Sequence, residues 1–455
     1  MSGLPGDGDT RAPSMRTTTS RLVFTFAVLL GINTMNFFDR QILPAVQEKI
    51  RTDWRLSDSE LGWLGTAFIL LYAVVGLPLG RLADVGRRKW ILAAGVGLWS
   101  LLTLGSGLAW GFWSLFVMRL GVGVGEASCA PAASSLIGDL VSAPRRARAM
   151  AIFMLGLPLG LALSFLVSGT IAERRSWQEA FFVAGLPGLL LAVAALFIAE
   201  PTRGSADLHA GPASRLPFLA VVRRVLGMPT MWWIIASGAL HNFNMYALGT
   251  FLASFLKRYH SVSVERAGQV SGLVYGFGAL GIFAAGWLGD RAFRRGVSGR
   301  LHVAWIGLAA AIPCLFLALD APAGELWRCV VWLLPACMLL YAYYGTVYAT
   351  IQDIIEPSLR GMAMALYFCA MYLLGAVLGP VATGWASDHF AQRAAVADGS
   401  PIVTELHKAI GLHDAMYLIP LLNVALVVVL FAASRTVKGD YLRCRQRMAA
   451  ASEGE

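Results

Sequence analysis

The chain has 455 residues, of which 57% are hydrophobic and only 14% charged, and its mean hydropathy is +0.63. A soluble globular domain is about 25% charged, so this composition excludes an ordinary soluble protein and predicts an all-α integral membrane protein. The net charge of +10 does not by itself predict nucleic-acid binding, because multi-pass membrane proteins concentrate Lys and Arg in their cytoplasmic loops.

Apolar stretches of about 20 residues recur along the chain, and a helix of that length crosses the hydrocarbon core of a bilayer. The first 20 residues are polar, which predicts a disordered cytoplasmic N-terminus (1–20) rather than a cleaved signal peptide. The pattern predicts twelve membrane-spanning helices, at 21–48, 59–80, 88–109, 112–138, 147–171, 178–199, 229–256, 266–289, 301–319, 327–351, 361–386 and 412–433.

A polar segment divides these helices into two groups of six. The expected organisation is an N-terminal half (21–199), a cytoplasmic linker (200–228), a C-terminal half (229–434) and a cytoplasmic tail (435–455). With this topology the cytoplasmic loops hold the larger part of the 37 Lys and Arg residues. This asymmetry is the one expected when both termini are cytoplasmic.

Two pairs of segments match between the halves. The segment "GRLADVGRRK" (80–89) follows the second predicted helix, and "GWLGDRAFRR" (286–295) follows the eighth. The segment "DLVSAPRRARAMAIF" (139–153) parallels "DIIEPSLRGMAMALY" (353–367). The repetition predicts two pseudo-symmetric six-helix halves around a central site, an arrangement typical of secondary transporters.

Four charged residues lie away from the ends of predicted helices in the N-terminal half: Asp39 and Arg40 in the first, and Arg119 and Glu126 in the fourth. A charge near the bilayer centre costs at least about 2.5–3.5 kcal/mol and usually faces a bundle interior. Arg119 and Glu126 are about 10 Å apart along the helix axis, so each should have its own partner. Adjacent residues point about 100° apart, so Asp39 and Arg40 should face different surroundings.

These four residues also suggest a chemistry. A carboxylate held between burial and an arginine can act as a proton switch, because protonation releases the arginine and deprotonation recaptures it. We therefore predict that Asp39 and Glu126 couple transport to protons, and that Arg40 and Arg119 bind an anionic headgroup. The alternative is a static salt bridge that joins the first and fourth helices.

The C-terminal half carries aromatic and amide side chains in place of these charges. The predicted substrate contacts are His241 and Asn244 in the seventh helix and Tyr344 and Tyr348 in the tenth. The two tyrosines are at positions i and i+4 and share one helix face. Charges on one wall and aromatics on the other suit an amphipathic substrate, and the alternative is that these side chains only pack between helices.

Charged residues at the predicted cytoplasmic ends of the helices indicate a gate. An acidic side chain there can bind an arginine or cap the N-terminus of a neighbouring helix. The predicted gate residues are Asp84, Arg87, Arg88, Asp139, Arg146, Asp290, Asp353 and Arg360. The alternative is a solvated set of loops that only fixes the orientation of the chain.

The loop Gly80-x-x-x-Asp84-x-Gly86-Arg87-Arg88 resembles the signature loop of the major facilitator superfamily. The segments "RLGVGVGEASCAPAASSLIGDL" (119–140), "RRARAMAIFMLGLPLGLALS" (145–164) and "WQEAFFVAGLPGLL" (177–190) resemble the Spinster branch of that superfamily. The resemblance implies alternating access and proton-coupled transport of a lipid such as a lysophospholipid or a sphingoid phosphate. It also implies that the four charged residues form the coupling and headgroup region.

A second function stays open, because organic-anion transporters of the same superfamily also carry an Asp-Arg pair in the first helix. The alternative function is proton-coupled transport of a small organic anion or a drug-like molecule. An enzyme is not expected, because the six cysteines are scattered and the histidines do not cluster along the sequence. We expect no cofactor, no metal and no nucleic acid, and a monomer whose partners are its substrate, protons and membrane lipids. The expected location is a bacterial inner membrane.

Overall fold

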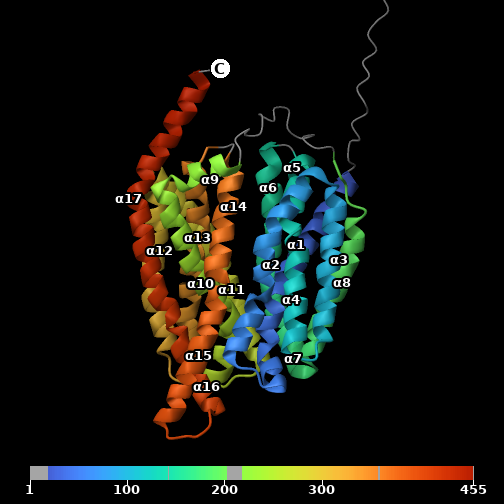
Figure 1. The fold of residues 1–455 in the computed structure, drawn as a ribbon, viewed down its shortest axis with the longest axis vertical. Helices are drawn as coiled ribbons and strands as arrows, with labels where there is room; N and C mark the ends of the chain where they lie inside the picture. Colours follow the sequence, from blue (N-terminus) through green and yellow to red (C-terminus); the bar gives the residue numbers. More distant parts are fainter. Residues whose placement is uncertain (1–18, 142, 202–217, 357–358, 454–455) are drawn as a thin grey trace, which may run out of the picture.

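The computed structural model describes residues 19–141, 143–201, 218–356 and 359–453. The described chain is almost entirely helical, and its helices form two groups that stand side by side, α1–α8 and α10–α17 (Figure 1). We call the end of the bundle where α1 begins and beyond which α17 extends the terminal face, and the opposite end the distal face (Figure 1). Most of the predicted disordered N-terminus and most of the predicted linker lie outside the described residues.

The helix bounds follow the predicted spans closely. The first group is α1 (Thr19–Trp54), α2 (Asp58–Val85), α3 (Arg88–Gly107), α4 (Phe112–Glu126), α5 (Cys129–Leu140), α6 (Ala143–Met154), α7 (Gly156–Arg174) and α8 (Trp177–Ala195). The short α9 (Phe218–Leu226) leads to α10 (Pro229–Tyr259), α11 (Val264–Phe293), α12 (Gly299–Leu319), α13 (Leu326–Ile354), α14 (Arg360–Met371), a π-helical turn (Tyr372–Ala376), α15 (Leu378–Ala397), α16 (Glu405–Met416) and α17 (Leu418–Glu453). Each of the twelve predicted spans therefore corresponds to one helix or to consecutive helical pieces.

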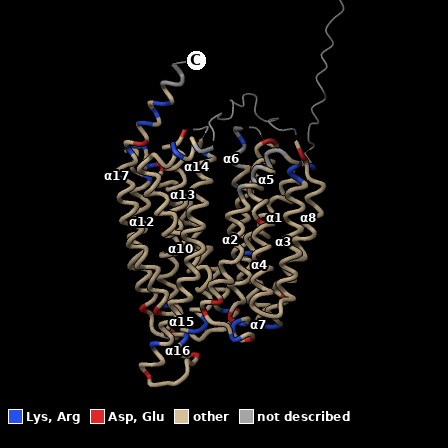
Figure 2. Tube along the Cα trace, in the orientation of Figure 1, with Lys and Arg blue, Asp and Glu red and all other residues tan. Residues whose placement is uncertain are grey.

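Ten helical segments in the described part of the chain are long and apolar enough to cross a membrane. The two remaining predicted spans differ for visible reasons. One is divided into α4 and α5, of 15 and 12 residues. The other is α10, whose middle carries the polar side chains His241, Asn242 and Asn244. In Figure 2 the charged residues gather mainly at the two faces, with uncharged chain between them.

Four of the predicted spans are broken, each about four residues before a proline. Proline has no N–H, and its ring clashes with the carbonyl of residue i−4, so the helical hydrogen-bond ladder is interrupted there. The breaks fall after Glu126 with Pro131 ahead, after Met154 with Pro158 ahead, at the turn that ends at Ala376 with Pro380 ahead, and after Met416 with Pro420 ahead.

The last helix is longer than predicted. α17 continues to Glu453, whereas the predicted span ends at residue 433 and the rest was expected to be a tail. The segment beyond residue 433 contains no proline and is rich in Arg and Ala, which are good helix formers. The helix therefore extends past the bundle at the terminal face (Figure 1).

The two halves meet along two seams, α2 with α15 and α7 with α11. Glycine allows the backbones to approach closely at both. A Cβ on Gly62 would lie 2.4 Å from the carbonyl oxygen of Pro380, and a Cβ on Gly268 would lie 2.7 Å from that of Phe165. Any side chain at either glycine would push the halves apart near the distal face.

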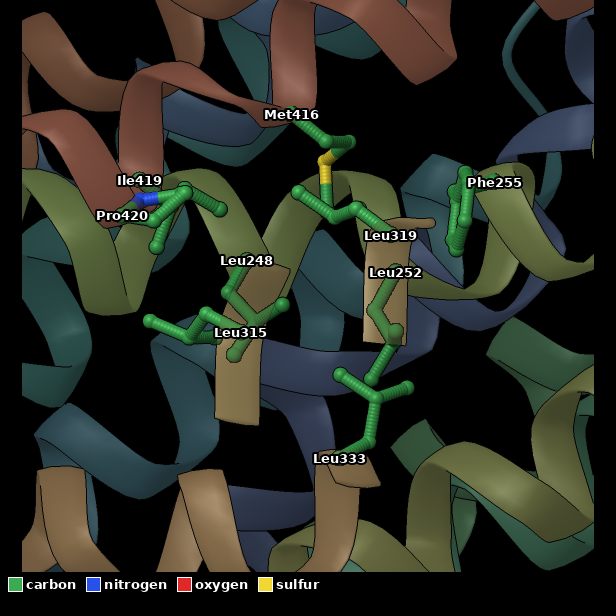
Figure 3. Close-up of a pocket in the computed structure, with 9 residues that line it drawn as sticks. All are labelled: Leu248, Leu252, Phe255, Leu315, Leu319, Leu333, Met416, Ile419 and Pro420. Atoms are coloured by element: carbon green, nitrogen blue, oxygen red, sulfur yellow. The ribbon is translucent and has the colours of Figure 1, made fainter. Parts of the chain in front are cut away.

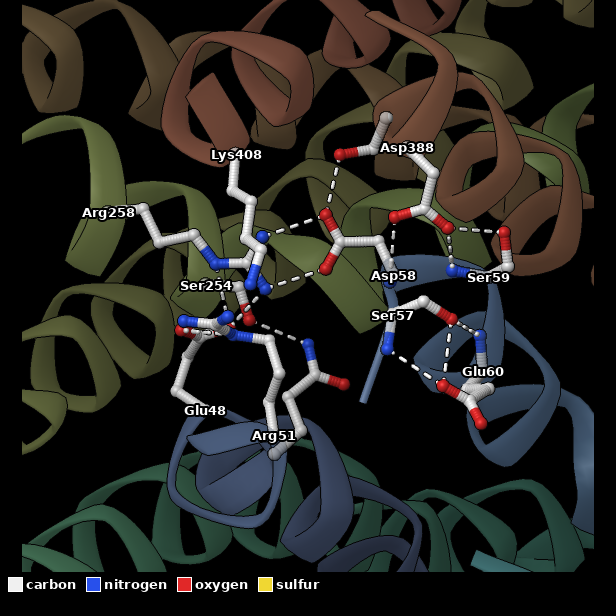
Figure 4. A network of polar contacts seen from close by, with 12 residues as sticks. Glu48, Arg51, Ser57, Asp58, Ser59, Glu60, Ser254, Arg258, Asp388 and Lys408 are labelled. Carbon is white, nitrogen blue, oxygen red and sulfur yellow. Dashed lines mark hydrogen bonds and ion pairs between the residues drawn. The ribbon is translucent and has the colours of Figure 1, made fainter. Parts of the chain in front are cut away.

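A network of buried charges joins the halves at the distal face, and we call it the distal network (Figure 4). Its centre is Arg258 of α10, which donates hydrogen bonds to Glu48 of α1 at 2.6 and 2.9 Å. Arg258 also donates to both carboxylate oxygens of Asp58 of α2, each at 2.7 Å. All three side chains are only 4% exposed. One arginine of the C-terminal half thus binds two carboxylates of the N-terminal half, and Glu48 is also paired with Arg51 at 3.3 Å and Lys257 at 3.6 Å.

Two further contacts complete the distal network. Asp388 of α15 accepts hydrogen bonds from the backbone N–H groups of Asp58 and Ser59 at 3.0 and 2.8 Å, so it caps the N-terminus of α2. Arg51 of α1 pairs with Glu405 of α16 at 2.6 Å. Among the described residues, the hydrogen bonds and ion pairs between the halves all lie toward the distal face. The structure is therefore closed at that face.

Arg258→Gln is expected to open the distal face. Breaking a buried ion pair by removing one partner costs about 3–5 kcal/mol, and here Glu48 and Asp58 lose the cation that they share. Spin labels on Thr52 and Val396, which are exposed near the distal ends of α1 and α15, should report a larger population at long distance by pulsed electron resonance. Arg266→Gln is the control, because Arg266 is exposed and its guanidinium donates to Gln269 of its own helix. An unchanged distance distribution in a folded Arg258→Gln variant would contradict the closing role.

Candidate functional site

A small cavity lies inside the C-terminal half (Figure 3). Its volume is about 10 Å³, and its lining is entirely apolar: Leu248, Leu252, Phe255, Leu315, Leu319, Leu333, Met416, Ile419 and Pro420. A cavity of this size has room for about one water molecule, and a bound water needs polar partners. This space is a packing defect next to the α16–α17 break and not a candidate site.

The larger cavity, which we call the central cavity, lies between the two halves and has a volume of about 120 Å³. Its lining residues come from α1, α2, α7, α10, α11 and α13: Phe37, Arg40, Gln41, Pro44, Gly65, Phe68, Leu157, Leu161, Met245, Tyr246, Gly249, Thr250, Tyr275, Tyr341 and Tyr344. The N-terminal half supplies the one charged side chain of this lining, and the C-terminal half supplies its four tyrosines. The central cavity therefore has a cationic wall and an aromatic wall.

Arg40 provides the cationic wall. Its guanidinium carbon lies 5.0, 5.5 and 4.7 Å from the ring centroids of Phe37, Phe68 and Tyr72. A cation over aromatic faces is stabilised by the ring quadrupoles. Its Nε donates to Glu126 at 2.8 Å, and 9% of the Arg40 side chain is exposed. The guanidinium is thus held on one edge by a carboxylate while it borders the cavity.

Glu126 is fully buried and has one unused acceptor. Its Oε2 accepts from Arg40, whereas Oε1 has no hydrogen-bond partner among the described residues. The residue ends α4, where the backbone oxygens of Gly123 and Gly125 accept from the N–H groups of Ala127 and Ser128, and Pro131 has no N–H for the oxygen of Ala127. The unpaired oxygen of this carboxyl group can take up a proton while the other oxygen stays close to Arg40.

Asp39 has a different partner from its neighbour, as the helical geometry predicts. Arg119 of α4 donates from Nη1 to the Asp39 carboxylate at 2.9 Å and from Nη2 to the Asp39 backbone oxygen at 3.1 Å. The hydroxyl of Thr103 on α3 donates to the other carboxylate oxygen of Asp39. Arg119 is 1% exposed and does not line the central cavity. In this conformation Arg119 is therefore bound to protein, and its predicted contact with substrate stays a prediction.

The predicted contacts in the C-terminal half lie at two depths. Tyr344 lines the central cavity, and Tyr348 packs against it with ring centroids 5.6 Å apart. His241 is fully buried behind Tyr344, stacked on Tyr343 at 4.0 Å, and neither ring nitrogen has a partner among the described residues. Asn244 is also buried, and its amide has no partner within the same described set. Only Tyr344 of these predicted contacts borders the cavity directly.

Four of the predicted gate residues, Arg88, Asp139, Asp290 and Asp353, form ion pairs within their own halves. Arg88 at the start of α3 pairs with Asp139 at the end of α5. Arg300 at the start of α12 pairs with Asp353 at the end of α13 and with Asp290 of α11 at 2.7 Å. The two pairs occupy equivalent places in the two halves, which agrees with the internal repeat in the sequence.

The remaining gate predictions divide into two groups. Arg360 donates to the backbone oxygen of Gln352 at 2.9 Å and not to Asp353, and Arg87 is exposed. The side chains of Asp84 and Arg146 lie outside the described residues. A latch between the halves at the terminal face thus stays a prediction for a conformation in which that face is closed.

Several residues of the site were not found by sequence reasoning. Arg300 could have been found, because it occupies in the second repeat the place that Arg88 holds in the first. Tyr275 of the aromatic wall carried no signal beyond its residue type. The distal network was missed because its residues lie near helix ends, where charges are ordinary, and are up to 354 residues apart in sequence.

Comparison with known proteins agrees with this architecture. The family model described as Major Facilitator Superfamily matches residues 28–397. An MFS-type efflux pump of Mycolicibacterium smegmatis is 29% identical over 79% of this chain and 83% of its own length. Protein spinster homolog 1 of Homo sapiens is 29% identical over 81% of this chain and 73% of its own length.

Solved structures give the same result. A bacterial homologue of the human lysosomal transporter Spinster, in an inward-facing and unoccupied conformation, superposes with a TM-score of 0.84 at 28% identity and covers 93% of this chain and 99% of the other. A nucleoside transporter superposes with a TM-score of 0.69 at 11% identity, over 89% of this chain and 99% of its own, and shares the fold. The chain belongs to the Major Facilitator Superfamily, and its relatives place it with the Spinster branch of that superfamily.

Proposed function

We propose that this chain is a proton-coupled secondary transporter that moves an amphipathic anion, such as a lysophospholipid or a sphingoid phosphate, by alternating access. The observation that carries the proposal is the Arg40–Glu126 pair, in which a cavity-lining guanidinium is held by a buried carboxylate at 2.8 Å. Arg40 binds the anionic headgroup, and the aromatic wall with Tyr344 receives the apolar part. The form closed at the distal face is one of the two end states.

Proton coupling follows from competition for one guanidinium. When Glu126 is ionised, it holds the Nε of Arg40; when Glu126 is protonated, that edge of Arg40 is released and can bind a phosphate or carboxylate of the substrate. By linkage, an anion bound to Arg40 in turn favours protonation of Glu126. Substrate and proton therefore bind together in the central cavity. Asp39 is the second proton site of the proposal. Its protonation would release Arg119 as a further cation for the substrate.

The lipid class rests on the resemblance to Spinster transporters and on the two different walls of the central cavity. The alternative is a small organic anion or a drug-like molecule, and two observations favour it. One relative is an MFS-type efflux pump, and a cavity of about 120 Å³ must widen before it can hold an acyl chain. The two candidates differ in whether an apolar tail contributes to affinity.

Glu126→Gln is expected to abolish the response to a pH gradient. Glutamine has nearly the same size but cannot exchange a proton, so transport of labelled lysophospholipid into liposomes should no longer be stimulated by the gradient. Exchange of substrate without a gradient should persist. Glu179→Gln is the matched control, because Glu179 lies at the start of α8 and pairs with the exposed Arg175. If a folded Glu126→Gln variant is stimulated by the pH gradient as fully as the wild type, Glu126 is not the proton switch.

Arg40→Lys is expected to weaken substrate binding about tenfold, because lysine keeps the charge but cannot offer the planar fork that binds phosphate or carboxylate. Binding should be measured by calorimetry on purified protein, with a lysophospholipid and with a short-chain organic phosphate. The control is Arg174→Lys, whose side chain is 70% exposed and pairs with Glu265 at 3.0 Å. Equal affinity for both ligands would favour the small-anion alternative, and unchanged affinity in Arg40→Lys would remove Arg40 from the site.

A further inference from the structure

The Asp39 carboxylate is bound by two different kinds of donor. Arg119 of α4 donates to Oδ1 at 2.9 Å, and the hydroxyl of Thr103 donates to Oδ2. Asp39, Thr103 and Arg119 are 3%, 1% and 1% exposed. The hydroxyl comes from α3, a helix that carries no other proposed site residue. Three helices thus meet at one carboxylate in the interior of the N-terminal half.

The hydrogen bond of Thr103 differs from that of four other helical threonines in this chain and resembles that of Thr170 on α7, which donates to the carboxylate of Glu265 at 3.3 Å. Thr25, Thr34, Thr346 and Thr350 each donate to the backbone oxygen four residues earlier in their own helix. That bond is the usual choice for a threonine inside a helix. Thr103 forgoes it and donates to a carboxylate of another helix, which is a stronger, charge-assisted acceptor.

A hydroxyl suits both protonation states of a carboxyl group. It donates to the ionised form, and by rotating about its C–O bond it accepts from the protonated form. Arginine has no acceptor and can only donate. When Asp39 gains a proton, its bond to Arg119 weakens, while the bond to Thr103 can persist with the roles reversed.

We propose that Thr103 is a positioning residue for proton exchange at Asp39. It holds the carboxyl group of Asp39 against α3 in both protonation states, so that protonation releases Arg119 without moving Asp39. Its hydroxyl also supports the ionised form. This inference rests on the proposed proton coupling and adds a residue to it.

The other groups around Asp39 define what a pH measurement reports. Arg119 and Glu126 face it from α4, and Arg40 follows it on α1. The described charged residues of α3, α7 and α8 lie near the ends of those helices, and His241 of α10 is the mid-depth histidine. Because a substitution at Thr103 leaves all of these groups in place, a change in the pH dependence of transport can be assigned to Thr103.

The test compares Thr103→Val with Thr103→Ser in full-length protein reconstituted in liposomes. Valine keeps the shape but removes the hydroxyl, which takes a donor from the ionised carboxylate. The pH of half-maximal lysophospholipid transport should rise by about one unit in Thr103→Val, with KM near the wild-type value. Thr103→Ser should restore the wild-type profile. Ser106→Ala is the control on the same helix, because Ser106 donates to its own backbone at Leu102.

A second readout does not depend on transport. The infrared band of the protonated Asp39 carboxyl group, identified by its loss in Asp39→Asn, should move to higher frequency in Thr103→Val and stay in place in Thr103→Ser. Equal shifts in the valine and serine variants, or no shift in either measurement, would overturn the role of Thr103. Transport without any pH dependence in the wild type would instead refute the proposed proton coupling, and the infrared band would still decide whether Thr103 binds this carboxyl group.

Discussion

The structure of the N-terminal half depends on one constraint: four charges buried at membrane depth must neutralise one another. An unpaired charge there costs several kcal/mol, and α1 places two opposite charges in succession. Because neighbouring residues diverge by about 100° around a helix, Asp39 and Arg40 cannot share one partner. They are satisfied by Arg119 and Glu126, two turns apart on α4, and each pair forms between helices. The pairing fixes the rotation of α1 against α4 and turns Arg40 toward the central cavity.

One of these ion pairs lies next to a helix break that precedes a proline. Glu126 is the last residue of α4, so it belongs to the C-terminal turn of that helix. The negative end of the helix dipole disfavours a second negative charge, which increases the dependence of Glu126 on Arg40. The equivalent position in the C-terminal half carries no such pair; α13 continues unbroken and supplies tyrosines instead. The two repeats therefore share a scaffold but divide the chemistry of the central cavity between them.

The sequence predicted most of the fold and part of the site, and the difference has a physical origin. Membrane spans follow from local hydropathy, so helices lie near all twelve predicted places, and ten helical segments of the described chain are long and apolar enough to cross a membrane. Charges in apolar runs identified Asp39, Arg40, Arg119 and Glu126. The partners of Arg258 could not be predicted, because their pairing depends on how two rigid halves approach. Thr103 was also missed, since nothing in its local sequence distinguishes it from threonines that bond to their own helix. Features that depend on one segment, such as its hydropathy, can be predicted from the sequence. Contacts between helices that are far apart in the sequence cannot.

α1 connects the central cavity to the distal network. One continuous helix carries Asp39 and Arg40 at mid-depth and Glu48 and Arg51 near the distal face. Pro44 lies between the two groups, where the missing N–H leaves the carbonyl of Arg40 without its helical donor and makes bending easiest. A change in the bonding of Arg40 therefore acts on the same helix whose far end is bound to Arg258. Because a buried ion pair is either intact or broken at a cost of several kcal/mol, the distal network gives α1 two discrete states. In the proposed mechanism, a change at Glu126 reaches the distal face through α1 and this contact.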